Sequence, residues 1–160
     1  WAKRIAQRDQ ARLDEQLEAV KTELQKEMKL FEEKLAKERR ADDARHKVRG
    51  ETMERLSQLL VLIGNIETVF LNRGDEPSQW RCWAEYEGAL PLLRAHFERY
   101  EIPYLQSYGA DFVRIGDAIN VMAHERNESK AQGRPWTISF SELKEAIKAL
   151  QRKISAADGV

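Results

Sequence analysis

The feature that most constrains the fold is a regular series of large apolar residues near the start of the chain. The series comprises Leu13, Leu17, Val20, Leu24, Met28, Phe31 and Leu35, with spacings of 4, 3, 4, 4, 3 and 4 residues. It repeats after eleven residues, which corresponds to about 3.67 residues per helical turn. An α-helix with this period keeps these side chains on one face. We call them the N-terminal apolar stripe and predict a nearly straight or slightly right-handed helix.

The predicted helix that carries the stripe covers residues 1–49. Neither Pro nor Gly occurs before Gly50, and pairs such as Glu33 with Lys37 favour helix at a spacing of four. At 1.5 Å per residue, this helix is about 75 Å long. Residues 36–47 contain no large apolar side chain, so this part is either a solvated neck or a hinge, with Gly50 as its weakest point.

Apolar residues recur at helical spacing throughout the rest of the chain and predict a compact bundle. The predicted apolar faces comprise Met53, Leu56, Leu59, Leu60, Leu62, Ile63, Ile66, Val69 and Phe70, then Trp83, Tyr86, Leu90, Leu93, Phe97 and Tyr100, then Leu105, Tyr108, Phe112, Ile115, Ile119 and Met122, and finally Leu143, Ile147, Leu150 and Ile154. Faces this wide are buried against several other helices. The predicted fold is all-α, with a coiled-coil-like helix over residues 1–49 and a four-helix bundle over residues 50–157.

Charge and composition exclude several functional classes. Residues 1–50 hold 14 Lys and Arg against 11 Asp and Glu, and residues 51–160 hold 13 against 16, so neither part is basic enough to favour nucleic acid. The sequence has no HExxH motif, no Gly-rich phosphate loop and no cluster of Cys and His. We therefore expect no metal and no cofactor.

The cysteine count and the N-terminal charges indicate where in the cell the protein is located. A single cysteine, Cys82, rules out an internal disulfide framework and fits a reducing compartment, so we expect a cytoplasmic protein. The longest apolar run, residues 59–64, is too short to cross a bilayer. Four basic residues follow Trp1, namely Lys3, Arg4, Arg8 and Arg12. This order is typical of the cytoplasmic flank of a transmembrane helix. Two interpretations follow: a membrane segment precedes Trp1, or Trp1 is an arbitrary boundary of the sequence.

The N-terminal apolar stripe requires a partner. Bundle helices of about 20 residues span roughly 30 Å, so they cannot cover a helix of about 75 Å along its whole length. We expect the stripe to pair with a second copy of the chain. The alternatives are that the helix folds back over the bundle as a fifth helix, or that another protein covers it.

Aromatic and arginine residues form a second candidate surface at one end of the predicted bundle. An antiparallel hairpin would bring Trp80 and Arg81 close to Arg126, and the loop with Arg134 and Trp136 leaves from the same end. Tryptophan with arginine is the usual composition of an interface hot spot. The alternative is a hydrophobic cap that closes the bundle, which is the expected role of Trp83.

One pair of residues has an enzyme-like spacing. Arg40 and His46 resemble the Arg-x(4–6)-His motif of HEPN ribonucleases, an all-α family in which the arginine and histidine act on the RNA phosphodiester. The resemblance implies a ribonuclease, although Ala41 replaces the polar residue usually found after the arginine. The alternative is a solvated helix face. The remaining histidines, His96 and His124, are expected to be surface or boundary residues.

The order of parts resembles that of a group of uncharacterised bacterial helical proteins. Leu17–Leu35 matches their charged helix of the type LxxELxxxxxxFExKL, and His96–Leu105 matches part of their compact helical domain. The resemblance implies neither an activity nor functional residues. We therefore expect a non-catalytic oligomerisation or scaffold module, with a HEPN-like ribonuclease and a regulatory module at the Trp80 and Trp136 end as alternatives.

Overall fold

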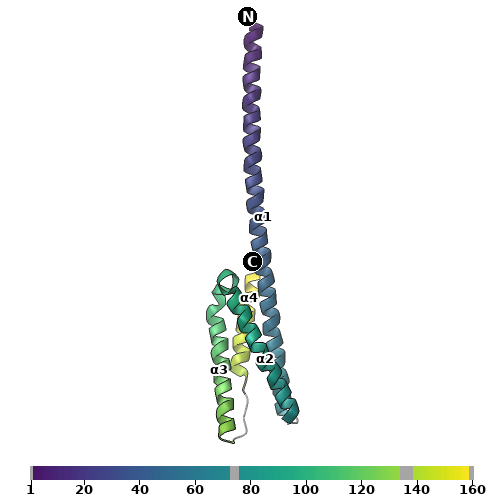
Figure 1. Cartoon of the computed structure of the whole chain (residues 1–160), viewed down its shortest axis with the longest axis vertical. Helices are drawn as coiled ribbons and strands as arrows, with labels where there is room; N and C mark the ends of the chain where they lie inside the picture. Colours follow the sequence, from purple (N-terminus) through teal and green to yellow (C-terminus); the bar gives the residue numbers. More distant parts are fainter. Residues whose placement is uncertain (1, 73–75, 134–138, 159–160) are drawn as a thin grey trace. The chain divides into compact units, whose positions relative to one another are not determined.

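The computed structural model describes residues 2–72, 76–133 and 139–158, and every element within these ranges is helical (Figure 1). The predicted all-α class is therefore confirmed for the described residues. The chain divides into two compact units, Trp1–Ala44 and Arg45–Val160.

The first helix, α1, is longer than the sequence pattern predicts. It extends over Ala2–Leu71, so it supplies the described part of the first unit and the beginning of the second. The prediction that this helix ends near residue 49 is wrong, because α1 continues through Gly50. One glycine costs a helix about 1 kcal/mol. Val48 and Thr52, on either side of it, are both buried in the second unit and offset this cost.

Three more α-helices complete the second unit. α2 (Glu76–Tyr100) and α3 (Gly109–Ala131) are joined by a π-helical turn, η1 (Glu101–Leu105), and a 3₁₀ turn, η2 (Gln106–Tyr108). The connection between α2 and α3 is thus a change of helix type. α4 (Ser141–Asp158) ends near the turn between α2 and α3 in Figure 1.

Polar side-chain contacts show which helices of the second unit are neighbours. The contacts join Thr52 with His96 (α1 and α2), Glu87 with Arg126 (α2 and α3), Asp111 with Lys153 (α3 and α4), and Glu67 with Lys144 (α1 and α4). Each of the four helical segments therefore contacts the next in chain order, and α4 returns to α1.

One hydrophobic core lies between these segments. Its most deeply buried side chains include Leu56, Leu59, Ile63 and Ile66 from α1, Trp83 and Tyr86 from α2, Ile115 from α3, and Leu143, Ile147, Leu150 and Ile154 from α4. The four α4 residues are exposed by 1% at most, so the predicted apolar face of this helix is confirmed in full. Phe140 packs on Trp83 and Tyr86 from just before α4.

Candidate interaction surfaces

The N-terminal apolar stripe lies on α1 in the first unit and is open to solvent. The exposed fraction ranges from 53% for Leu24 to 63% for Phe31, and only Leu35 is half-buried. Within the described part of the first unit α1 is the sole element, so nothing in that unit covers the stripe. Leu30 is also 66% exposed, but it lies off the stripe because successive residues are rotated by about 100° around the helix.

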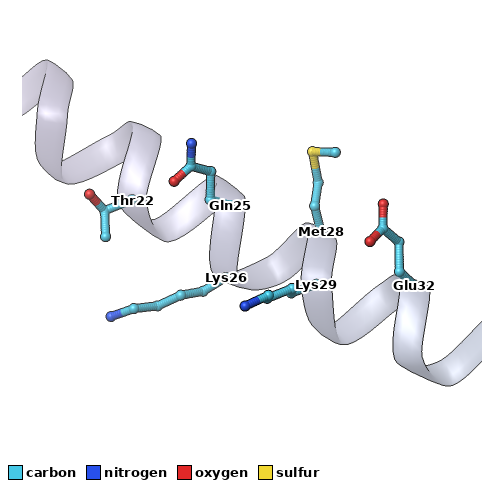
Figure 2. Close-up of a pocket in the computed structure, with 6 residues that line it drawn as sticks. All are labelled: Thr22, Gln25, Lys26, Met28, Lys29 and Glu32. Carbon is cyan, nitrogen blue, oxygen red and sulfur yellow. The ribbon is translucent and has the colours of Figure 1, made fainter.

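Figure 2 shows the side chains around the middle of the stripe. Met28 projects from one side of the helix and Lys26 from the other, as expected for a helix with one apolar face (Figure 2). The surface recess at this place is lined by Thr22, Gln25, Lys26, Met28, Lys29 and Glu32. All of these residues belong to one helix, so the recess is an open helix surface rather than an enclosed binding cavity.

The aromatic and arginine residues of the second unit converge as the hairpin predicts. The Arg126 guanidinium lies 4.4 Å from the ring centre of Trp83 and 5.4 Å from that of Trp80. Its Nη1 also donates to Oε1 of Glu87 at 2.7 Å. Trp83 is buried, which confirms its predicted role in the core, whereas Trp80 remains 48% exposed. Arg126 thus links α3 to two aromatic rings of α2.

The structure does not show the other predicted members of this surface in contact with Trp80 or Arg126. Arg81 lies on α2 next to Trp80 in sequence, and its side chain is exposed. Arg134 and Trp136 lie outside the described residues. The surface that the structure describes therefore centres on Trp80 and Arg126.

A groove of about 750 Å³ lies between α2 and α3 and was not predicted from the sequence. The rings of Phe97 and Phe112 stack in its wall with centroids 3.8 Å apart. Pro91 and Gly116 also line the groove, and a Cβ added at Gly116 would meet no atom within 4 Å. The lining combines apolar residues with charged ones, among them Arg94, Glu98 and Asp117. No sequence signal identified this groove, because periodicity does not specify the distance between facing helices.

The prediction that His96 lies at the surface or boundary is wrong, because its side chain is buried. Its Nε2 lies 2.9 Å from Oγ1 of Thr52, and this hydroxyl donates to the carbonyl oxygen of Val48 at 2.7 Å. Because the hydroxyl proton is already used, the Thr52 oxygen accepts a hydrogen bond from Nε2, and neutral His96 carries its proton there. Burial, reinforced by Arg55, lowers the pKa of His96, while Glu51 acts against the shift.

The remaining chemical candidates are the Arg40 and His46 pair, a metal site and Cys82. Arg40 belongs to the first unit and His46 to the second, both on the exposed surface of α1, so the ribonuclease interpretation stays a prediction. Among the described residues, no three side chains of His, Cys, Asp or Glu converge to hold a metal ion. The side chain of Cys82 is half-buried.

Comparison with known proteins identifies no relative of this chain. No known protein family matches the chain, and no curated protein or solved structure shows significant similarity to it. Across the part of the chain that the structure describes, no helix has a stretch both long and apolar enough to cross a membrane. The function is therefore inferred from the surfaces described above.

Proposed function

We propose that this chain is a non-catalytic oligomerisation module in which the N-terminal apolar stripe of one copy packs against a second copy. In this proposal the first unit is a coiled-coil-like extension, and the four helical segments of the second unit act as one helical bundle. The observation that supports the proposal is the continuous exposure of the stripe from Leu13 to Phe31.

The hydrophobic effect favours covering the stripe. Full burial of a large apolar side chain is worth about 1.5–3 kcal/mol. Side chains exposed by more than half, such as Leu24 and Met28, would each gain roughly 1 kcal/mol on pairing. Contiguous exposed apolar surface of this kind marks interaction sites. Scattered exposed residues in the second unit, such as Val61 and Val121, form no comparable series.

A second candidate function is a regulatory binding site at the Trp80 end of the second unit. Trp80 is half exposed, and the Arg126 guanidinium lies near its ring. An exposed tryptophan beside an arginine can anchor a protein partner. Arg126 is also held by Glu87, so the ring and the charge are already positioned for contact.

The test of the proposed function is the molar mass of the full chain at several concentrations, measured by light scattering. We expect a mass above that of one chain, and at least tenfold weaker association for Leu24→Glu because two charges would enter the centre of the paired stripe. Leu30→Glu is the matched control. It introduces the same charge at a leucine of similar exposure on the same helix, but outside the stripe.

The circular dichroism of both variants verifies that the helices are retained. A monomeric wild-type chain would contradict the proposal. Equal weakening by Leu24→Glu and Leu30→Glu would also contradict it, because it would show that association does not depend on the stripe.

A further inference from the structure

The groove between α2 and α3 is elongated and lies wholly within the second unit. On α2 and the turn that follows it, the lining extends from Glu87 to Glu101, and on α3 it extends from Phe112 to Asn120. A helix rises 1.5 Å per residue, so the α2 side of the groove is about 20 Å long. An open groove of this length suits a polypeptide segment that lies along the helices better than a compact small molecule, which binds in an enclosed pocket.

The floor and the rim of the groove differ in chemistry. The lining residues that are buried or half-buried are all apolar or glycine, and they include the stacked rings of Phe97 and Phe112. The exposed lining residues are polar or charged, apart from Pro91 and Val113. Protein interfaces have the same arrangement, with an apolar centre inside a polar rim. A partner could therefore bury an apolar side chain on the floor of the groove.

Negative charge exceeds positive charge on the rim. The lining contains four carboxylates and one guanidinium, that of Arg94. Nε of Arg94 lies 2.8 Å from Oε1 of Glu98 on the same helix. Arg126, which does not line the groove, lies 2.7 Å from the carboxylate of Glu87. Each of these arginines is therefore matched by one carboxylate, which leaves two carboxylates on the rim.

The two remaining carboxylates are those of Glu101 and Asp117. Both side chains are exposed, and neither forms an ion pair with another residue that the structure describes. The neighbouring residues Arg99 and Arg114 lie on the opposite faces of their helices and do not line the groove. Among the described residues, α1 and α4 contribute nothing to the lining. Two accessible carboxylates without a cation of their own attract a positively charged partner.

We propose that this groove binds a basic peptide segment of another protein, with one apolar side chain on the floor and a lysine or arginine near each of the two carboxylates. The proposal is independent of the N-terminal apolar stripe, which lies in the first unit. An anionic partner such as nucleic acid would be repelled by Glu101 and Asp117. A wholly apolar segment would cover these carboxylates without a counter-charge, and their desolvation would oppose binding.

The positions of the two carboxylates define the spacing of the basic residues in the partner. Oε1 of Glu101 lies 3.8 Å from the place that a Cβ of Gly109 would occupy, so this carboxylate lies beside the first turn of α3. Asp117 is eight residues further along α3, which is about 12 Å along the helix axis. A helical partner would cover this distance with cations about eight positions apart, and an extended one with cations about four positions apart. Phe112 and Gly116 lie between the two levels, so the apolar side chain comes between the cations.

Selection from a peptide library tests the proposal without assuming a sequence for the partner. The full chain is immobilised and presented with displayed random peptides of about twelve residues, which span most of the groove in helical form. We expect the enriched peptides to combine apolar residues with lysine or arginine. In solution, measured by fluorescence anisotropy, they should bind more weakly as salt concentration rises. Enrichment of acidic or uncharged peptides, or no enrichment, would overturn the proposal.

Two glycine variants determine whether the enriched peptide occupies the groove. Gly116→Leu places a side chain in the groove, where an added Cβ meets no atom within 4 Å, and leucine favours helix more than glycine does. Gly88→Leu is the matched control, because this glycine of α2 has equally open surroundings and does not line the groove. We expect Gly116→Leu to weaken binding by roughly tenfold or more, and Gly88→Leu by less than about twofold. Equal effects in two proteins of unchanged circular dichroism would place the peptide elsewhere and contradict the proposal.

Charge variants determine whether the two carboxylates select the partner. Glu101→Gln combined with Asp117→Asn should weaken binding by about threefold or more and reduce its salt dependence. Glu85→Gln is the control, because Glu85 is an exposed carboxylate of α2 outside the groove. Unchanged affinity and salt dependence in the double variant would refute the charge complementarity on which the proposal depends. Light scattering of Gly116→Leu should give the same molar mass as the wild type, and a loss of self-association would show that a second copy occupies the groove instead.

Discussion

The two parts of α1 have the same kind of apolar spacing and opposite degrees of burial. Leu24, in the first unit, is 53% exposed, whereas Leu59, in the second, is 1% exposed. Both belong to series with spacings of three and four residues along one continuous helix. Apolar spacing therefore identifies the apolar face of a helix, whereas burial of that face depends on covering residues from other segments. For Leu59 they come from the core that the helices of the second unit share, and for Leu24 none lie in the described part of its own unit.

The polar contacts of the two units also differ, in the sequence separation of the residues they join. In the second unit, Nζ of Lys144 contacts the carboxylate of Glu67 at 2.9 Å, and these two residues are 77 positions apart. In the first unit, Lys21 contacts Glu18 within one helical turn. Tertiary contacts thus stabilise the second unit, while local helical contacts maintain the first. This difference is consistent with the proposal that the apolar residues of the first unit serve assembly, whereas those of the second unit form its core.

The largest expected effect compares one leucine from each unit. We expect Leu59→Ala to lower the free energy of unfolding by about 2–5 kcal/mol, because it opens a cavity in a packed core. We expect Leu24→Ala to change the same transition by less than about 0.5 kcal/mol, as for other exposed positions. Urea unfolding followed by tryptophan fluorescence provides the measurement, since Trp80 and Trp83 report on the second unit.

A shift of the fluorescence transition in Leu24→Ala as large as that in Leu59→Ala would break the comparison. It would mean that the two units unfold as one cooperative body, and that the stripe supports the fold as well as any assembly.

The pH dependence of stability extends the comparison between the two units, because His96 is a buried titratable group in the second unit. The pKa of His96 is lowered in the folded state, first by burial and then by Arg55 and Arg99, and is partly restored by Glu51. The unfolded chain therefore binds a proton more readily than the folded one. Stability should be constant above about pH 7.5 and fall as the pH drops below 6.5, by at most about 1.4 kcal/mol per pH unit.

The control for this prediction is His96→Gln, which keeps an amide donor for Thr52 but does not titrate. Urea unfolding of both proteins between pH 7.5 and 5.5 gives the comparison. We expect the variant to lose less stability than the wild type on acidification. Parallel losses in the two proteins would show that groups other than His96 cause the pH dependence.

Sequence periodicity was sufficient for the all-α class and for the apolar face of α4, because local spacing determines both. The four core residues of α4 illustrate this success, as does the approach of Arg126 to Trp80 that the hairpin implied. The break at Gly50 was wrongly predicted, because the propensity of one residue was outweighed by the burial of its neighbours.

Features that no spacing pattern specifies could not be predicted. The hydrogen bond between Thr52 and His96 joins residues 44 positions apart, and neither residue has a sequence signal for burial. The groove between α2 and α3 likewise depends on the distance between helices, which periodicity does not specify. The proposed partner of the N-terminal apolar stripe likewise cannot be read from the spacing of one helix.

The smallest expected effect compares two hydroxyl groups, one from each unit. The hydroxyl of Tyr86 is buried without a hydrogen-bond partner among the described residues, and burial, with a smaller effect of Glu87, raises its pKa. A buried unpaired hydroxyl destabilises a fold, so Tyr86→Phe should raise the free energy of unfolding by about 1 kcal/mol in urea titrations. The exposed hydroxyl of Thr22 donates to the Glu18 carbonyl, and water can replace that bond, so Thr22→Val should change stability by less than about 0.5 kcal/mol. Destabilisation by Tyr86→Phe would show instead that this hydroxyl is paired in the folded protein.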